Sequence, residues 1–436
     1  MLLPRLWLGK DCSSTPLRLS FEFSNFKPCN FKYYCIPDCD MVRRGFIKSP
    51  PPISNTRMRI RELLPDIFLG DHFPGFLNSI TDVPGVSVST QDITSYDKTV
   101  NTGVTCIIPR EDWYHKACYA GLFSFNGLGE MTGTHNVAES GLLHTPIVLT
   151  GSFGIGAAHQ GILEYGVRTI DRKFMALPVA AETYDGYLHD CASFAVTPKH
   201  VVEGLQKANS GEAVEEGNKG GGCGMICHGF KGGNGSSSRL VQIPHSDETF
   251  TVACMVQANY GSMDGLRIAG VPVGRILAAE TERDKKRKKA KEDLEKAKEE
   301  KDGSIIVIIA TDAPLLPHQL TRIAKRATVG LSRVGGVGYN MSGDIFLAFS
   351  TAKEISINQS RPAEGVFISA VHRVEAVEDS ALSWLFEGTA DCVEEAIYNC
   401  LCMAETMEGL DGHKVEALPL QRVKEIMQEY GKSQMG

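Results

Sequence analysis

This chain of 436 residues lacks the features that mark several common protein classes. It has no run of eighteen apolar residues, so no membrane-spanning helix is expected. It has no excess of positive charge: the net charge is −7 and the isoelectric point is about 6.0, which is unfavourable for general binding to nucleic acid or acidic membranes. It has no paired metal-ligand motif such as HExxH, and His159, His189 and His228 stand singly. Neither a metal nor another cofactor is predicted.

Two glycine-rich segments look like phosphate-binding loops but lack the decisive residues. In GSFGIGAAHQG, His159 stands where a dinucleotide fingerprint needs its third glycine. The segment 217–235 is rich in glycine but has no GK[ST] ending. We therefore expect both segments to allow close packing of the backbone.

The thirteen cysteines are an odd number, and Cys106 and Cys254 lie within apolar, strand-like segments. Buried thiols suit a reducing compartment, so a cytoplasmic location is expected. Residues 1–57 differ in composition from the rest and show no clear secretory signal. They are interpreted as a poorly ordered extension, with an organelle-targeting segment as the alternative. Cys29, Cys35 and Cys39 lack the CxxC spacing of a zinc site.

The remainder, 58–436, is predicted to form a single domain. Short apolar runs such as PIVLTG, FTVACMVQA and DIFLAFST indicate strands, and 3–4 residue periodicity indicates helices near 157–168, 316–333 and 381–407. Helices that cover two stacked sheets would explain this mixture, which is of the α+β class. The run 280–302 is almost entirely charged and is interpreted as a solvated insertion.

The most informative step in the sequence is the bond between Gly303 and Ser304. There the charged run ends and a continuously apolar strand, 305–310, begins. A hydroxyl that follows glycine can approach the preceding carbonyl carbon without hindrance from a Cβ atom. Cleavage would leave Ser304 as a new terminus, whose α-amine, with a pKa of roughly 7.7–8.0, can serve as base for its own hydroxyl. Self-cleavage is therefore predicted here. Gly235 and Ser236 form a competing cut site by the same local chemistry.

Polar residues at other strand ends are candidates for the same site. Ser342 and Asp344 lie two residues apart, hence on one face of a strand, and a hydroxyl beside a carboxylate can orient an ammonium group or relay its proton. Asn259 ends a strand and can donate its amide to an oxyanion without adding charge. Asn218 is a weaker candidate for that role, because its loop is interpreted as backbone lining.

Two further residues suit the recognition of a substrate with a free amine. Glu182, in AAETYDG, can hold an ammonium group through a charge-assisted hydrogen bond. Tyr184 can donate its phenol to the oxyanion or the leaving group. Glu130, in NGLGEMTG, is a second carboxylate that could line the pocket. For Glu182 and Tyr184 the structural alternative is an ordinary surface turn.

Several sequence blocks between residues 59 and 409 resemble one known family, in the same order. These blocks are NSITDVPGV, FNGLGEMTG, LPVAAETYDGYLHD, GNKGGGCGMICHGFKGG, MVQANYG, GVPVGR, GSIIVIIATDAPLLPHQL and SGDIFLAFST. The family is that of the DmpA/BapA peptidases, which comprises self-processing L-aminopeptidase/D-esterases and β-peptidyl aminopeptidases. The resemblance implies a four-layer αββα sandwich like that of N-terminal-nucleophile hydrolases.

The resemblance also implies roles for individual residues. Ser304 matches the nucleophile after the cut, Asn259 the oxyanion amide, and Glu182 and Tyr184 the substrate-binding pair. Ser342 and Asp344 match a serine and a glutamate that assist the nucleophile. Aspartate here is one methylene shorter.

The function implied is that of a self-processing serine aminopeptidase or amidase, cut into 58–303 and 304–436. It would act on short peptides, amides or esters as a homo-oligomer of processed pairs. Two alternatives are an acyltransferase of the ornithine acetyltransferase type, which usually carries a threonine nucleophile, and an unprocessed, non-catalytic scaffold.

Overall fold

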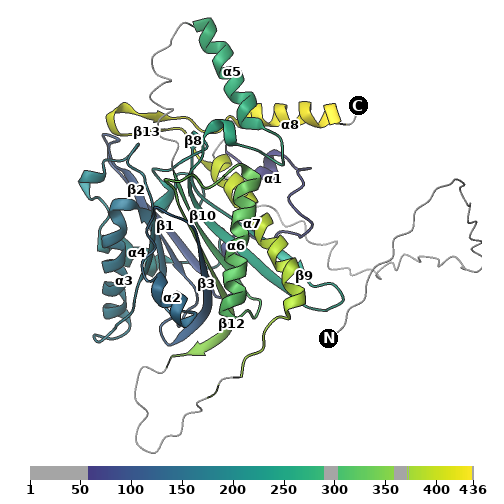
Figure 1. Cartoon of the computed structure of the whole chain (residues 1–436). Coiled ribbons are helices and arrows are strands. Elements are labelled where there is room, and N and C mark those ends of the chain that lie inside the picture. The colour runs from purple at the N-terminus through teal and green to yellow at the C-terminus, as the bar shows by residue number, and fades with distance from the viewer. Residues whose placement is uncertain (1–56, 289–302, 358–370, 372, 435–436) are drawn as a thin grey trace, which may run out of the picture. The chain divides into compact units, whose positions relative to one another are not determined.

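The structure is a computed structural model that describes residues 57–288, 303–357, 371 and 373–434 (Figure 1). One compact unit spans residues 55–436. Residues 1–56 of the predicted extension and residues 289–302 of the charged insertion lie outside the described residues. The single-domain boundary at residue 58 stays a prediction.

A six-stranded sheet forms the centre of the unit, with the strand order β4-β3-β12-β11-β10-β9. β11 pairs in parallel with β12 and antiparallel with β10. Every residue of β11 is buried, and most are β-branched, which suits a strand that is covered on both faces. The bounds are β3 Lys116–Gly127, β4 Leu142–Leu143, β9 Gly233–Gln242, β10 Thr249–Asn259, β11 Ser304–Thr311 and β12 Gly343–Ser356.

A second sheet of four strands, in the order β1-β2-β5-β6, packs against the first. Its strands are β1 Ser87–Thr94, β2 Asn101–Ile108, β5 Ile147–Gly151 and β6 Val179–Thr183. β5 and β6 are parallel and are joined by a helix, whereas β1 and β2 form an antiparallel pair. Two small two-stranded sheets pair β7 Ile226–Cys227 with β8 Phe230–Lys231, and β13 Met407–Glu408 with β14 Lys414–Val415.

Helices cover the outer face of each sheet (Figure 1). α6 Pro317–Val334 and α7 Leu382–Met403 pack on the larger sheet, while α3 Ile155–Thr169 and α4 Pro198–Lys207 pack on the smaller one. The layers are therefore αββα, as expected. The helices expected near 157–168 and 316–333 correspond to α3 and α6. The third, expected to reach residue 407, ends at Met403, because β13 starts soon afterwards.

Residues along β11 alternate between two hydrophobic cores. Ile306 and Ile308 belong to the core between the two sheets, whereas Ile305, Val307 and Ile309 belong to the core beneath α6 and α7. A third core lies between the smaller sheet and the pair α3 and α4. This alternation fixes which face each residue at the start of β11 presents.

The remaining helices are α1 Ile60–Leu63, α2 Thr134–Ser140, α5 Val273–Lys288 and α8 Leu420–Gln434. α5 and α8 project from one end of the layers (Figure 1), and Glu280 of α5 pairs with Arg422 of α8 at 2.6 Å. The first part of the predicted charged insertion is therefore the helical end of α5. Every helix in the described part of the chain is too short or too polar to cross a bilayer.

Candidate active site

Ser304 is the first residue of β11, and its side chain faces the space between the two sheets. It lies on the same face of the strand as Ile306 and Ile308, two residues and four residues further on. The side chain is largely buried, and its Oγ accepts a hydrogen bond from the Gly343 N–H at 3.0 Å. Because Oγ is an acceptor in this contact, the hydroxyl keeps its own proton available for transfer.

Gly303 runs against the end of β10. A Cβ atom at this position would overlap the Asn259 carbonyl oxygen and crowd the Cα atom of Tyr260. Glycine is thus required by packing as well as by the open approach to its carbonyl carbon. A residue larger than glycine is excluded here because the atoms that it would meet belong to the backbone and cannot rotate away as a side chain can.

Asn259 is the residue directly opposite Ser304 in the pairing of β10 with β11. Its amide has a fixed orientation: Oδ1 accepts from the Ile226 N–H at 2.8 Å, and Nδ2 donates to the Tyr184 carbonyl at 2.9 Å. One N–H of Nδ2 remains for a further acceptor, since an amide nitrogen carries two. An amide held in this way is suited to stabilise negative charge next to Ser304.

Ser342 and Asp344 lie together, as the two-residue spacing predicts. The Ser342 hydroxyl is 2.7 Å from Asp344 Oδ2 and 2.8 Å from the Tyr339 carbonyl, so its single proton can be donated to either. Asn126, from β3, donates to Ser342 Oγ at 2.9 Å and is 3.5 Å from Asp344 Oδ2. A polar group of three side chains, with Ser342 and Asp344 buried and Asn126 half-buried, therefore flanks the start of β11.

The Asp344 carboxylate reaches β11 despite its shorter side chain. It pairs with Ile305 in the parallel register, and a hydrogen bond from the Ile305 backbone helps to stabilise its charge. Burial nevertheless raises the pKa of Asp344 above its usual value, against the effect of Ser342 and Asn126. The Asp344 side chain lies on the face of β12 that packs against the helices, the face of Phe346 and Ala348. It is therefore beside the backbone nitrogens of β11 and not beside the Ser304 hydroxyl.

Glu182 is the last but one residue of β6, and its carboxylate is buried. Oε1 accepts from the Glu130 N–H at 2.9 Å, and Oε2 accepts from the Ser152 hydroxyl. Gly129 lies between this carboxylate and Gly343, whose N–H donates to Ser304 Oγ. A Cβ atom added to Gly129 would lie 3.5 Å from Glu182 Oε1 and 3.0 Å from Gly343 Cα. Burial raises the pKa of Glu182, and the two hydrogen bonds partly offset that effect.

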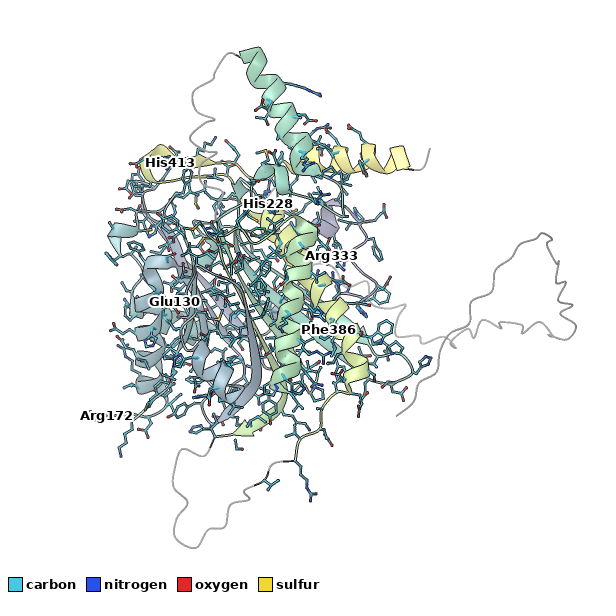
Figure 2. All side chains as sticks on the ribbon, in the orientation of Figure 1. Glu130, Arg172, His228, Arg333, Phe386 and His413 are labelled. Carbon is cyan, nitrogen blue, oxygen red and sulfur yellow. The ribbon has the colours of Figure 1, made fainter. Side chains whose placement is uncertain are left out.

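Tyr184 and Glu130 contribute backbone groups to the site. The Tyr184 carbonyl holds Asn259. The residue as a whole is 53% exposed, and its ring folds back over Gly186. Glu130 is exposed and uses its N–H to hold Glu182. A cavity of about 300 Å³ adjoins Glu130 and is lined also by Thr132, Thr134, His135, His159 and Leu177, together with Met131, Gly133 and Pro178. Glu130 is labelled in Figure 2.

Asn218 has a different partner. Its Nδ2 donates to the Glu405 carbonyl at 2.8 Å, and its Oδ1 accepts from the Glu405 N–H at 3.0 Å. The amide thus fixes the chain after α7. Of the two asparagines proposed for the oxyanion, Asn259 is the one that the structure places opposite Ser304.

Ser236 lies within β9, and its hydroxyl is enclosed. Oγ donates to the Cys254 carbonyl at 2.7 Å and accepts from the Ile80 N–H at 2.8 Å. Both hydrogen-bonding roles of the hydroxyl are used, in a residue that is fully buried.

Sequence reasoning missed three supporting residues: Asn126, Ser152 and Lys231. Lys231 is completely buried, and its Nζ donates to the carbonyls of Met225 at 2.7 Å and Gly232 at 2.9 Å. Burial lowers the pKa of Lys231 to about 8. These bonds close the β7–β8 hairpin, which supplies the Ile226 N–H to Asn259.

The sequence carries a weak signal for these residues, because each lies in a segment that is notable for other reasons. Asn126 lies in FNGLGEMTG with Glu130, and Ser152 and Lys231 lie in the two glycine-rich segments. His228, at the turn of the same hairpin, is also buried, and its Nδ1 lies 3.0 Å from the Ser262 carbonyl (Figure 2).

Comparison with known proteins identifies the family. The model of peptidase family S58 matches residues 78–415. A curated relative, the β-peptidyl aminopeptidase BapA of Sphingosinicella microcystinivorans, is 39% identical over 364 residues, covering 82% of this chain and 89% of the relative. BapA of Sphingosinicella xenopeptidilytica is 37% identical over 364 residues, with 81% and 88% covered.

Solved structures agree with this assignment. The β-aminopeptidase of a Burkholderia species has a TM-score of 0.74 and 39% identity, covering 85% of this chain and 99% of its own. The L-aminopeptidase D-Ala-esterase/amidase of Ochrobactrum anthropi has a TM-score of 0.71 and 39% identity, with 83% and 96% covered. It is described as a prototype for the serine aminopeptidases and as a variant of the Ntn hydrolase fold.

The predicted family and the predicted αββα fold are thus confirmed, and hydrolase chemistry is favoured over acyl transfer. From the extent of the family match and the identity to these relatives, the chain belongs to peptidase family S58 and is a hydrolase with the N-terminal-nucleophile fold.

Proposed function

We propose that this S58 enzyme cleaves its own chain between Gly303 and Ser304 and then acts as a serine aminopeptidase. The observation that carries the proposal is the pairing of Ser304 with Asn259, which sets a hydroxyl opposite a fixed amide donor at the start of a buried strand. A nucleophile and an oxyanion donor held in this way suit attack on a carbonyl carbon, which is the first step of amide and ester hydrolysis.

In the cleavage step, Ser304 Oγ attacks the Gly303 carbonyl carbon, and the bond from that carbon to the Ser304 nitrogen breaks. The nitrogen takes up the hydroxyl proton and becomes a free amine, while Gly303 is held as an ester. Water then hydrolyses the ester, which leaves a Gly303 carboxylate and a Ser304 hydroxyl. The charged run before Gly303 contains a single strongly apolar residue, Leu294, which is compatible with the departure of the new carboxylate.

In the mature enzyme, the free amine of Ser304 is the general base for its own hydroxyl. Oγ attacks the substrate carbonyl, Nδ2 of Asn259 stabilises the oxyanion, and the amine returns the proton to the leaving group. Water releases the acyl group in a second round. Asp344, supported by Ser342, lies next to the strand's first backbone nitrogens and favours the protonated amine that forms in each cycle.

The substrate class follows from Glu182. An ionised carboxylate that is buried and hydrogen-bonded at this edge of the site would bind the free ammonium group of a short peptide, amide or ester. The names of the relatives, a β-peptidyl aminopeptidase and an L-aminopeptidase D-Ala-esterase/amidase, agree with that class.

The experiment compares a small amine-bearing substrate with its N-acetylated form. Purified, processed protein is given L-alanine anilide, a β-alanine anilide and a D-alanine ester, together with the acetylated version of each. Release of the leaving group from the free amines alone supports the proposal. Equal rates on the acetylated substrates, or activity in unprocessed protein, would contradict it.

We further propose that processed pairs associate as a homo-oligomer in the cytoplasm. Phe68, Phe73 and Phe76 are each at least 70% exposed, which is unusual for a short segment of a monomer. The nine cysteines in the described part of the chain are all free, as suits a reducing compartment. Light scattering after size exclusion and localisation of the tagged full chain test the two statements.

A further inference from the structure

Three side chains with metal-binding chemistry meet in the turn that follows β6. They are Asp185, His189 and Cys191, and one carboxylate oxygen, one imidazole nitrogen and the thiol sulfur lie within 4.8 Å of one another. The N–H groups of Leu188 and His189 both donate to the Asp185 carbonyl at 3.1 Å, which forms a single helical turn. Residues four apart on such a turn share a face, so Asp185 and His189 are brought together by the backbone.

The same three residues line a small enclosed cavity. Its volume is about 10 Å³, which is close to the space of one water molecule or ion. Thr102 also lines it, and the contacting rings of Phe153 and Phe194, 5.8 Å apart, border it on the outer side. Asp185 is 2% exposed and His189 is 4% exposed, so polar ligand atoms face a confined space.

The turn is held by groups other than the three ligands. Asp190 Oδ1 accepts from the Ala192 N–H at 3.0 Å, and the Ser193 hydroxyl donates to the Asp190 carbonyl at 2.6 Å. The Thr102 hydroxyl donates to Asp185 Oδ2 at 2.7 Å. A hydrogen bond of this kind to a carboxylate ligand orients it towards a metal.

We propose that Asp185, His189 and Cys191 form a binding site for Zn²⁺ or a similar divalent transition-metal cation. The combination of thiolate, imidazole and carboxylate is a donor set that Zn²⁺ accepts in a tetrahedral site, whereas Mg²⁺ and Ca²⁺ require oxygen ligands. Three protein ligands leave the fourth position open to water. On binding, the Cys191 thiol loses its proton to solvent as the metal–sulfur bond forms.

Three adjustments accompany binding. The Cys191 thiol, which donates to Asp185 Oδ1 at 3.7 Å, loses this hydrogen bond with its proton. Metal–ligand distances of about 2.0–2.3 Å place tetrahedral ligand atoms roughly 3.3–3.7 Å apart, so the widest separation in the cluster closes by about 1 Å. The Asn101 N–H lies 3.3 Å from His189 Nδ1, a long hydrogen bond that a metal at this nitrogen displaces. These changes are small next to the energy gained when a thiolate, an imidazole and a carboxylate bind Zn²⁺.

The position of the site gives it a connection with the catalytic centre. Asp185 directly follows Tyr184, whose carbonyl holds Asn259, and the Asp185 carboxylate packs against Gly151, which precedes Ser152. A metal ion would therefore stiffen the turn behind both Asn259 and Glu182. The sequence did not indicate this site, because its spacing, D-x₃-H-x-C, matches no paired-histidine or paired-cysteine motif.

The test uses Co²⁺ as a spectroscopic probe and Zn²⁺ as its competitor. Purified full-chain protein is freed of metal with a chelator and titrated with Co²⁺. We expect one equivalent to bind with a thiolate-to-cobalt charge-transfer band, which Zn²⁺ then removes. Cys191→Ser should lose the band, and His189→Asn should weaken Zn²⁺ binding by at least about tenfold, because even supporting groups contribute that much.

Two controls keep the test specific. A chain with Cys12, Cys29, Cys35 and Cys39 all changed to serine should keep the band, which excludes binding by the N-terminal segment. Zn²⁺ should raise the Tm of the metal-free wild type but not that of Cys191→Ser. The proposal is overturned if Co²⁺ gives no such band, or if the band and the Zn²⁺-dependent Tm shift persist in both ligand variants. Neither readout depends on peptidase activity.

Discussion

The larger sheet contains two Gly–Ser bonds that are alike in sequence and very different in surroundings. Gly303–Ser304 lies where β11 begins, with a hydroxyl that accepts one hydrogen bond and a neighbouring amide, Asn259, across the strand pair. Gly235–Ser236 lies inside β9, where both residues are paired with β10. There the hydroxyl is committed to the Cys254 carbonyl and the Ile80 N–H.

The difference shows that glycine before a hydroxyl is a necessary condition for this chemistry but not a sufficient one. Both glycines lack room for a Cβ atom, which would overlap the Ala396 carbonyl of α7 at Gly235 and the Asn259 carbonyl at Gly303. The difference lies in the backbone pairing: the carbonyl carbon of Gly235 is fixed within the β9–β10 ladder, which resists the change of geometry that attack requires. The Gly303–Ser304 bond instead lies at the end of a ladder, since Ser304 is the first paired residue of β11.

Replacement of each of the two serines by alanine should give the largest difference in self-cleavage and in kcat. Ser304→Ala is expected to leave the chain intact and to lower kcat on the order of 10⁶-fold, as loss of a nucleophile does. Ser236→Ala should still be cut, although the unpaired Cys254 carbonyl and Ile80 N–H would cost about 1–3 kcal/mol of stability. A denaturing gel and the Tm measure both results. Cleavage of Ser304→Ala would remove Ser304 from its proposed role.

The two asparagines allow the next comparison. Asn259→Asp replaces an amide donor by a negative charge and should lower kcat by about 10²–10³-fold, as loss of an oxyanion donor does. Asn218→Asp, whose partner is Glu405, is the matched control and should change kcat little. Steady-state kinetics on a chromogenic amide distinguish the two, and equal losses would argue against a specific role for Asn259.

The glycine before the cut gives a smaller effect. Gly303→Ala would place a methyl group against the Asn259 carbonyl, and overpacking of roughly 1–3 kcal/mol should slow self-cleavage by about 10- to 100-fold. Gly156→Ala, on α3, is the control, because nothing lies within 4 Å of its added Cβ. The rate of appearance of the two bands after synthesis measures the effect. A normal rate for Gly303→Ala would show that this packing does not matter.

The smallest expected effect is a displacement of the pH profile. Ser152→Ala removes a hydrogen bond that lowers the pKa of Glu182, so that pKa should rise above its already raised value. Only the ionised carboxylate binds an ammonium group. As the pH falls, the Ser152→Ala variant should therefore lose activity at a higher pH than the wild type does. The acid limb of kcat/KM against pH reports this shift. Ser140→Ala, an exposed serine elsewhere, should leave the limb unchanged.

The sequence predicted the fold class because its local signals agree with the global arrangement. The apolar run of β11 and the periodicity of α3 and α6 each indicate the element that forms. The family blocks supplied the order of layers, which periodicity alone does not contain. The helix at 198–207 was not predicted, since its strongly apolar residues are only Val201, Val202 and Leu205.

The site was predicted less completely, for a physical reason. Ser304 and Asn259 could be proposed separately from their strand ends, but the register that places them opposite each other depends on long-range pairing. Asn126 and Ser152 act through contacts with Ser342 and Glu182, which are far away in the chain, and no local pattern contains such contacts. Lys231 contacts its near neighbours Met225 and Gly232, but its complete burial depends on the surrounding fold. Asp185, His189 and Cys191 are close in sequence, but their cluster depends on one turn that brings the ligand atoms together and on the cavity that the fold forms around them.

The most direct test is intact mass spectrometry of fully active protein, combined with sequencing of the new amino terminus. The expected result is two polypeptides, one ending at Gly303 and one beginning at Ser304, with activity proportional to the cleaved fraction. A preparation that turns over substrate at full rate while residues 303 and 304 remain joined would contradict the account.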